Sequence, residues 1–339
     1  MNTEPLTWGI IGAGDIAKRV FDASQSVTAG SFRYVATRDA QNVPDLQTAF
    51  PNTQIVVGYE ALLELPDLDA VYVATPHPFH SEIVIAALDA GKHVLCEKPL
   101  GISSDQANAM MDAAQKSGSL LSEAYAYRFH PQLAKVAELI KGDAIGTPRI
   151  VRANFGFNMP FTPDHRLYEP ALGGGAVLDL GGYPTSLCFF IENLIDERSN
   201  QKPSLSAAGR VSESGVDDVS SALLQFDSGL IGEVSCSIAL DQSSDMHVIG
   251  TKGRLSITNI WSAGDAADRG SILRLERSGK DVEITAFADG ASNVYTLEFN
   301  AISNDILAGC REPRFPAVQN WNSRFLAELL GTWIGQVAN

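Results

Sequence analysis

A glycine-rich turn close to the N-terminus constrains the fold of this sequence more than any other feature. An apolar run, Leu6–Ile11, leads directly into Gly12-Ala13-Gly14-Asp15-Ile16-Ala17, which has the pattern G-x-G-x-x-A. Gly12 permits a tight turn, Gly14 lets backbone approach a pyrophosphate, and Ala17 lets a helix pack closely on the strand. The pattern therefore predicts a β-α-β dinucleotide-binding start, with phosphates at the helix N-terminus. The predicted cofactor contacts in this turn are Gly12, Gly14, Asp15 and Ile16.

The end of the second predicted strand, residues 32–36, bears on which dinucleotide binds. NAD-binding proteins usually place an Asp or Glu there to hold the ribose hydroxyls. Here the strand is followed by Thr37 and Arg38, a small hydroxyl and a guanidinium that suit a 2′-phosphate. Asp39 comes later than the ribose-binding position, and we expect it to cap a helix or a turn. These residues favour NADP(H) over NAD(H).

Strands and helices alternate through the first third of the chain. Residues 70–75 and 94–96 are apolar and are predicted to form buried strands, with a helix over residues 81–90 between them. This alternation predicts an α/β fold with a doubly wound parallel sheet, in which ligands bind beyond the carboxyl ends of the strands. The candidate ligand-binding residues at those ends are Thr75, Pro76, His80, Glu97 and Lys98.

Two histidines in this region, His77 and His80, are potential metal ligands. No third residue of a ligand type follows at a suitable spacing, so we expect no metal site. The expected role of the pair is to line the cofactor site or to cap the next helix.

From about Asp143 onward the pattern changes to short strands separated by Gly, Asp and Ser turns. This predicts an α+β domain with one large, mainly antiparallel open sheet, of which one face packs on helices. The other face is an expected contact surface for a homodimer or homotetramer. The chain thus divides into a Rossmann domain, residues 1–125, and a substrate-binding and oligomerisation domain, residues 126–339, whose C-terminal helix at 322–334 packs back. The predicted strands are residues 149–157, 206–211, 220–226, 231–238, 246–250, 253–257 and 272–275.

Composition limits the classes of partner. The chain of 339 residues has a formal net charge of -15, which argues against binding to nucleic acid. The glycine-rich turn, and not the charge, predicts a small-molecule ligand. It has no signal peptide pattern and no run of about 18 apolar residues, so neither export nor a membrane span is predicted. Its four cysteines form no C-x-x-C pair, which favours a reducing, cytoplasmic compartment.

Several longer motifs follow the glycine-rich turn in a fixed order. Ala-Thr-Pro-x-x-x-His occupies residues 74–80, and Ala-Gly-Lys-His-Val-Leu-Cys-Glu-Lys-Pro occupies residues 90–99. Two further motifs are Glu-Ala-Tyr-Ala-Tyr-Arg-Phe-His-Pro-Gln at 123–132 and Gly-Gly-Gly-Ala-Val-Leu-Asp-Leu-Gly-Gly-Tyr-Pro at 173–184. With these motifs the chain resembles the Gfo/Idh/MocA family of oxidoreductases over nearly its whole length.

The resemblance implies roles for three residues. Lys98, the lysine of the Glu-Lys-Pro motif, is implied to act in proton transfer. The family's second catalytic motif usually has a histidine four residues after its aspartate, whereas here Tyr183 holds that place after Asp179. With a tyrosine at this position, the chain resembles one branch of the family. That branch contains dimeric dihydrodiol dehydrogenases, NADP-dependent xylose dehydrogenases, glucose-fructose oxidoreductase and some nucleotide-sugar 3-ketoreductases. It argues against an inositol dehydrogenase.

The leading hypothesis is reversible hydride transfer between NADP(H) and a secondary alcohol or hemiacetal carbon of a sugar, a cyclic polyol or a dihydrodiol. Lys98 would be the acid and base, because burial and a positively charged nicotinamide ring favour its neutral form. Tyr183 would hydrogen-bond the reacting oxygen, and Asp179 would fix a hydroxyl group or orient Lys98. One alternative is a ketoreductase acting on a nucleotide-linked or glycosidic 3-keto sugar. A second alternative is a non-enzymatic cofactor-sensing regulator with the same fold.

The remaining candidate residues lie in loops. Arg128 is expected to contact the nicotinamide, its ribose or the substrate, or else to form an interdomain ion pair. Phe157 is a candidate wall of the substrate pocket. His165 and Arg166 precede the three glycines in a long loop and are candidate substrate contacts, because loops on a rigid scaffold often carry function.

Overall fold

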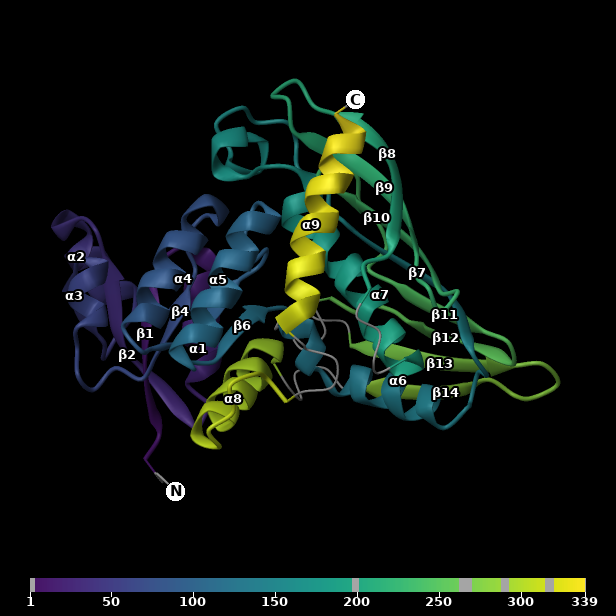
Figure 1. Ribbon diagram of the computed structural model, residues 1–339, viewed down its shortest axis with the longest axis horizontal. Helices are drawn as coiled ribbons and strands as arrows, with labels where there is room; N and C mark the ends of the chain where they lie inside the picture. The colour runs from purple at the N-terminus through teal and green to yellow at the C-terminus, as the bar shows by residue number, and fades with distance from the viewer. Residues whose placement is uncertain (1–3, 197–200, 262–269, 288–292, 315–319, 339) are drawn as a thin grey trace. The chain divides into compact units, whose positions relative to one another are not determined.

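The computed structural model describes residues 4–196, 201–261, 270–287, 293–314 and 320–338 (Figure 1). The chain forms two compact units. The first contains Met1–Ala126 together with Tyr295–Phe315, and the second contains Tyr127–Val294 together with Pro316–Asn339. The first boundary lies next to the one that we expected from the sequence. The segment Tyr295–Phe315 groups with the first unit, whereas the sequence analysis placed it in the second domain.

The first unit is built on a sheet of six strands in the order β3-β2-β1-β4-β5-β6. All its neighbouring strands are parallel, which confirms the predicted doubly wound α/β sheet. The central strand β1 is buried along its whole length, because helices cover both faces of such a sheet. The strands are β1 (Leu6–Ile11), β2 (Gly30–Thr37), β3 (Gln54–Val57), β4 (Ala70–Val73), β5 (His93–Glu97) and β6 (Leu121–Ala124).

Of the helices that connect these strands, α5 begins and ends at residues suited to helix termini. At the start of α5 the side chain of Ser103 accepts a hydrogen bond from Gln106 N. At its end Gly118 has a φ of 74°, in the left-handed region that glycine adopts without strain. The connecting helices are α1 (Asp15–Ser24), α2 (Val43–Ala49), α3 (Tyr59–Leu63), α4 (His80–Asp89) and α5 (Ser104–Ser117).

The helix α8 (Val294–Leu307) joins the first unit through an aromatic cluster. The ring of Phe299 is fully buried and stacks on Phe32, with 4.6 Å between their centroids, and its centroid lies 4.8 Å from that of Trp8. Trp8 Nε1 also donates a hydrogen bond to Ser303 Oγ at 3.2 Å. These contacts between the first strands and α8 explain why a segment near residue 300 belongs to this unit.

The second unit contains an open sheet of eight strands in the order β14-β13-β12-β11-β7-β10-β9-β8. Neighbouring strands are antiparallel except for β7 and β10, which are parallel. The predicted large, mainly antiparallel sheet is therefore confirmed. The strands are β7 (Pro148–Gly156), β8 (Ser204–Val211), β9 (Asp217–Gln225), β10 (Ile231–Ser237), β11 (Met246–Gly250), β12 (Gly253–Ile257), β13 (Ser271–Arg277) and β14 (Glu283–Phe287).

Helices cover one face of this sheet (Figure 1). The helix α7 (Gly182–Ile195) contacts β7 and β10, and α9 (Asn320–Val337) contacts β8 and β9, while α6 (Pro131–Lys141) packs against α7. The strand β9 shows the expected alternation of buried and exposed side chains, with Leu224 inside and Leu223 outside. In the described part of the chain, none of the helices has the length and apolar character needed to cross a bilayer.

Candidate active site

The glycine-rich turn of the first unit leaves space for a phosphate at the start of α1. Gly12 has a φ of 97°, and a Cβ at this position would lie 2.6 Å from Ala74 O, so only glycine fits. A Cβ at Gly14 would meet nothing within 4 Å, and α1 begins there without a side-chain cap. The N-H groups in the first turn of α1 are therefore available to a pyrophosphate. The Asp15 carboxylate is almost fully exposed, which leaves its backbone and that of Ile16 as the predicted contacts.

Arg38, at the end of β2, lies near two aromatic rings. The guanidinium carbon of Arg38 lies 6.0 Å from the ring centroid of Tyr59 and 5.6 Å from that of Phe79, distances typical of cation-π contacts. Thr37 is buried, and its hydroxyl donates to Asp39 O at 3.1 Å. The Asp39 carboxylate accepts from Gln41 N at 2.9 Å, so it caps the following short helix, one of the roles that the sequence predicted. Thr37 therefore shapes the turn, and Arg38 is the group that faces outward.

The loop that follows β4 is tied to the loop that follows β5 by a fully buried histidine. The ring nitrogens of His80 lie 2.8 Å from Thr75 O and 3.0 Å from Pro99 O. Burial lowers the pKa of His80. His80 therefore faces backbone, and it holds the loop after β4 against the loop after β5. Thr75 Oγ1 is buried without a hydrogen-bond partner among the described residues, which fits a bound polar group beside it. In that same part of the chain no three His, Cys, Asp or Glu side chains are placed to hold a metal ion.

Lys98 follows β5 and is half-buried, and hydrogen bonds hold the residues on both sides of it. Tyr72 Oη donates to Glu97 Oε1 at 2.5 Å, and Glu97 Oε2 accepts from Lys98 N at 3.3 Å. Burial raises the pKa of Tyr72 well above its ordinary value, so this hydroxyl remains a donor at neutral pH. On the other side, Leu100 N donates to the buried Glu123 Oε1 at 2.8 Å.

Together with the contact between His80 and Pro99, these bonds fix the backbone of residues 97–100. The sequence analysis did not assign this role to Tyr72 or Glu123. The available signal was a carboxylate within the short strand β6, Leu121-Ser122-Glu123-Ala124, whose four residues are all buried.

The second unit carries Asp179 and Tyr183 on one continuous helical segment. A π-helical turn (Val177–Gly181) leads directly into α7, and Asp179 within it is 5% exposed. Such π-turns are rare and occur often at functional sites. Arg166 Nη1 lies 3.2 Å from Asp179 Oδ1, so the structure brings together two residues that the sequence had assigned separately. His165 uses its ring nitrogen to accept from Leu167 N at 3.3 Å and thereby caps a short helix.

Aromatic rings hold the side chain of Tyr183. Its ring centroid lies 5.1 Å from that of Phe155, 5.7 Å from that of Trp261 and 5.8 Å from that of Tyr127. Trp261, which the sequence analysis did not single out, is fixed by a hydrogen bond from its Nε1 to Asn154 O at 2.7 Å. Arg128 is 4% exposed in the turn before α6, and Phe157 is half-buried just beyond β7.

Each unit carries candidate functional residues of its own. The first has a glycine-rich turn and a lysine at the carboxyl edge of a parallel sheet, and the second has a carboxylate and a tyrosine on one helical segment. Family models match both units: "Oxidoreductase family, NAD-binding Rossmann fold" covers residues 6–125, and "GFO/IDH/MocA C-terminal domain" covers residues 133–256. The chain belongs to the Gfo/Idh/MocA family. It is an oxidoreductase with an NAD(P)-binding Rossmann domain.

Relatives of this family member include named dehydrogenases and reductases. Trans-1,2-dihydrobenzene-1,2-diol dehydrogenase of Mus musculus is 33% identical over 329 residues, covering 96% of this chain and 95% of that protein. The Bos taurus protein of the same name is 31% identical, with 96% and 95% covered. Among solved structures, KijD10, a 3-ketoreductase from Actinomadura kijaniata in complex with NADP and TDP-benzene, is 27% identical with a TM-score of 0.84, and 98% of each chain is covered.

The two glycines of the turn should respond differently to a methyl group. Gly14→Ala is expected to fold normally and to weaken NADPH binding by tenfold or more, about 1.4 kcal/mol, because its Cβ enters the space expected for the pyrophosphate. Gly12→Ala is expected to destabilise the fold itself. Thermal unfolding and NADPH fluorescence titration measure the two effects. Gly331→Ala, on an exposed helix position with open space, is the matched control. Unchanged affinity in Gly14→Ala would place the cofactor elsewhere.

Proposed function

We propose that the protein oxidises a secondary alcohol carbon of a cyclic diol, a cyclic polyol or a sugar with NADP⁺, and reduces the corresponding ketone with NADPH. The observation that carries this proposal is the fixed position of Lys98 at the carboxyl end of β5. Hydrogen bonds to Glu97, Pro99 and Leu100 restrain the backbone around it, as a proton-transfer group requires. The relatives named as dihydrodiol dehydrogenases support a vicinal diol as substrate.

The preference for NADP(H) rests on the end of β2. Arg38 is the cation at this position, and its contacts with Tyr59 and Phe79 leave a guanidinium able to pair with a 2′-phosphate or stack on adenine. The Asp39 carboxylate, which would otherwise be the candidate to hold a ribose 2′-hydroxyl, is used as a helix cap. The NADP in the KijD10 complex agrees with this preference.

The side chains of this protein handle the proton and the orientation of the substrate. The bound nicotinamide supplies the hydride acceptor, or the donor in the reverse direction. As hydride leaves the carbon, Lys98 Nζ takes the hydroxyl proton, and it returns that proton when a ketone is reduced. Tyr183 hydrogen-bonds the reacting oxygen. Asp179, paired with Arg166, fixes a neighbouring hydroxyl of the substrate.

A ketoreductase acting on a nucleotide-linked 3-keto sugar is the second candidate. The similarity to KijD10 in both sequence and fold favours it. The residues assigned above serve either direction, so an absorbance screen at the nicotinamide wavelength separates the two. Oxidation of a dihydrodiol or free sugar supports the first, and NADPH consumption only with a nucleotide-linked ketone supports the second.

Replacing Lys98 tests the proton-transfer assignment. Lys98→Met is expected to lower kcat by about 10²- to 10⁴-fold, the usual contribution of a general acid or base, and to leave NADPH affinity nearly unchanged. Steady-state kinetics on the best substrate and NADPH titration give the two quantities. Lys280→Met, at an exposed turn, is the control and should match the wild type. If Lys98→Met retained most of its turnover, another residue would be the acid and base.

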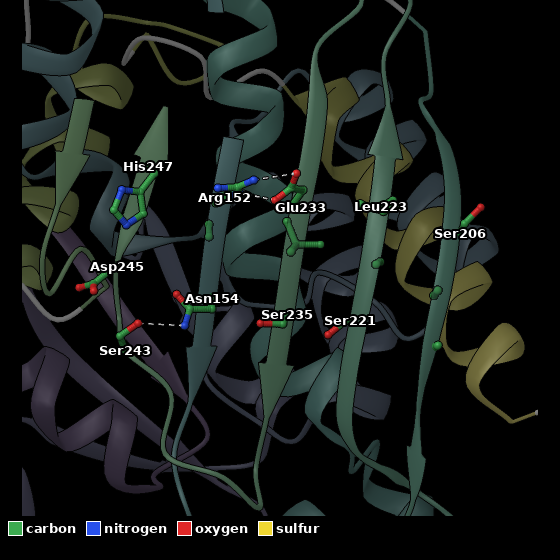
Figure 2. Close-up of a pocket in the computed structure, with 15 residues that line it drawn as sticks. Arg152, Asn154, Ser206, Ser221, Leu223, Glu233, Ser235, Ser243, Asp245 and His247 are labelled. Carbon is green, nitrogen blue, oxygen red and sulfur yellow. Dashed lines mark hydrogen bonds and ion pairs between the residues drawn. The ribbon is translucent and has the colours of Figure 1, made fainter. Parts of the chain in front are cut away.

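We also infer that the protein forms a homodimer or homotetramer through the outer face of its open sheet. This face has a hollow of about 670 Å³ lined by strands β7 to β11. Figure 2 shows the residues that line it, among them the ion pair between Arg152 and Glu233. Small side chains such as Ser221 and Ser235 line the hollow, and Leu223 beside them is 53% exposed. A broad face with an exposed leucine and an internally paired charge fits a two-fold contact between identical surfaces.

A new charge on this face should separate the subunits. Leu223→Arg is expected to yield monomers in size-exclusion chromatography with light scattering, because two copies would bury unpaired cations against each other. Val57→Arg places the same charge on the first unit, at a valine that is 47% exposed, and should leave the oligomer intact. A monomeric wild type, or an unaffected Leu223→Arg oligomer, would contradict this assignment.

The state of the cysteines indicates the cellular compartment of the protein. Cys96, Cys188 and Cys236 are buried as free thiols, and Cys310 is a free, half-buried thiol. Free thiols at all four positions are typical of a reducing environment, so we propose the cytoplasm.

A further inference from the structure

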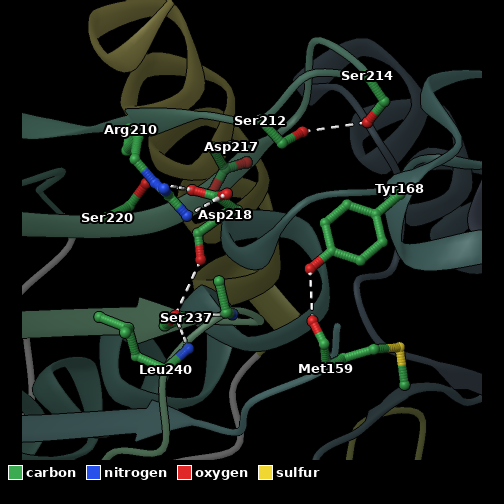
Figure 3. A network of polar contacts seen from close by, with 11 residues as sticks. Met159, Tyr168, Arg210, Ser212, Ser214, Asp217, Asp218, Ser220, Ser237 and Leu240 are labelled. Atoms are coloured by element: carbon green, nitrogen blue, oxygen red, sulfur yellow. Dashed lines mark hydrogen bonds and ion pairs between the residues drawn. The ribbon is translucent and has the colours of Figure 1, made fainter. Parts of the chain in front are cut away.

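A buried carboxylate outside the residues assigned above contacts the start of the helical segment that carries Asp179 and Tyr183. Asp217, the first residue of β9, is 6% exposed. Its Oδ2 accepts a hydrogen bond from Val177 N at 2.9 Å and another from Ser220 Oγ at 3.1 Å. Figure 3 shows Asp217 and Ser220 side by side within this polar network. The bond to Val177 joins residues that are 40 positions apart in the chain.

This bond satisfies a group that the helix itself leaves unpaired. The first N-H groups of a helix have no partner within it, and the π-helical turn that begins at Val177 has no side-chain cap of its own. Asp217 provides the acceptor from a neighbouring strand and places a carboxylate at the helix N-terminus, where negative charge is favourable. Asp179 follows Val177 by two residues, so a shift of the Val177 backbone displaces Asp179.

The second oxygen of Asp217 explains why residue 175 is glycine. Gly175 has a φ of 112°, and a Cβ there would lie 2.5 Å from Asp217 Oδ1. Gly175 N donates to Leu167 O at 2.9 Å, and Arg166, which pairs with Asp179, is the residue before Leu167. The Asp217 carboxylate therefore packs against residues 175–177, the stretch of chain that leads to Asp179.

The neighbouring carboxylate provides an internal comparison. Asp218 receives two hydrogen bonds from Arg210, from Nε at 2.9 Å and from Nη2 at 2.7 Å, and the side chain of Arg210 is largely exposed (Figure 3). None of the bonds described above joins Asp218 to the helical segment. Asp217 and Asp218 are therefore adjacent on one strand, but only Asp217 accepts a hydrogen bond from the Val177 backbone.

We propose that Asp217 is a positioning residue, which holds Asp179 and Tyr183 in their working arrangement through the N-H of Val177. The inference rests on the proposed function only in the statement that Asp179 and Tyr183 act in catalysis. The positioning itself is a property of the second unit alone.

The charge of Asp217 gives this role a pH dependence. Burial raises the pKa of Asp217 to about 6, against the lowering effect of its bonds from Val177 and Ser220, and the charge of Asp218 raises it further. The other titratable groups nearby are Arg210, which pairs with Asp218, and the buried Cys236 thiol, whose pKa is raised by burial and by the charges of Asp217 and Asp179.

At neutral pH Asp217 is ionised, and below about pH 6 it takes up a proton and loses its charge at the helix N-terminus. Because its folded pKa lies above the ordinary value of 3.8, folding binds this proton, and the free energy of unfolding falls as pH rises from about 4 to 6.

Hydrogen exchange measured by mass spectrometry tests the positioning directly. In Asp217→Ala, peptides covering residues 176–183 should exchange at least tenfold faster than in the wild type. Asp218→Ala should exchange there as the wild type does. Asp217→Asn keeps an acceptor oxygen without the charge, and it should fold even if the alanine variant does not, with an intermediate exchange rate. Wild-type exchange over residues 176–183 in both Asp217 variants would overturn the inference.

Kinetics test the consequence for catalysis. Asp217→Asn should lower kcat by about tenfold with little change in NADPH affinity. The wild-type kcat is expected to fall below about pH 6, and the variant should lack that fall. A variant that only lost stability would keep the wild-type pH profile and would overturn the inference. Asp179→Asn separates the two proposals: if it kept full turnover while exchange in Asp217→Ala still rose, the proposed function would fail and the positioning would stand.

Discussion

The carboxyl edge of the parallel sheet depends on polar groups buried within an apolar core. Strands β1, β2, β4 and β5 all end at this edge, where the backbone leaves the sheet and its hydrogen bonds must be replaced. His80 and Glu123 supply bonds to this backbone from buried positions, and the buried Tyr72 holds the Glu97 carboxylate, which accepts from Lys98 N. Because an unpaired buried polar group costs about 1–3 kcal/mol, the arrangement tolerates little displacement. This edge presents Lys98 in a single, defined place.

In the second unit, backbone groups at a helix terminus also need hydrogen-bond partners from outside the helix. The glycines at 173–175 let two stretches of backbone approach closely, and the buried carboxylate of Asp217 accepts the N-H that the helix leaves unpaired. The aromatic rings of Phe155, Tyr127 and Trp261 then surround Tyr183. In both units a candidate catalytic side chain is carried by an element whose backbone is held by buried neighbouring residues.

Most of the fold could be predicted from the sequence, because buried strands are apolar runs between turn residues. The bounds of β1, β11 and β12 are those that the pattern predicted. The missed strands β3 and β14 are edge strands with mixed burial, so they lack that signal. The motifs indicated Lys98, Asp179 and Tyr183 as candidates. The residues that hold them, such as Glu123 and Asp217, are 23 and 40 positions from their partners, and local patterns do not reveal such pairs.

We propose that the carboxyl edge of the parallel sheet binds NADP(H) and distinguishes it from NAD(H). Fluorescence titration of the purified protein with NADPH and with NADH tests the claim most directly. We predict that NADPH binds at least tenfold more tightly, because Arg38 gains a charge-assisted bond worth about 1.5–3 kcal/mol to the 2′-phosphate. Arg38→Leu should abolish that difference without weakening NADH. Equal affinity for the two cofactors, or tighter binding of NADH, would contradict the account.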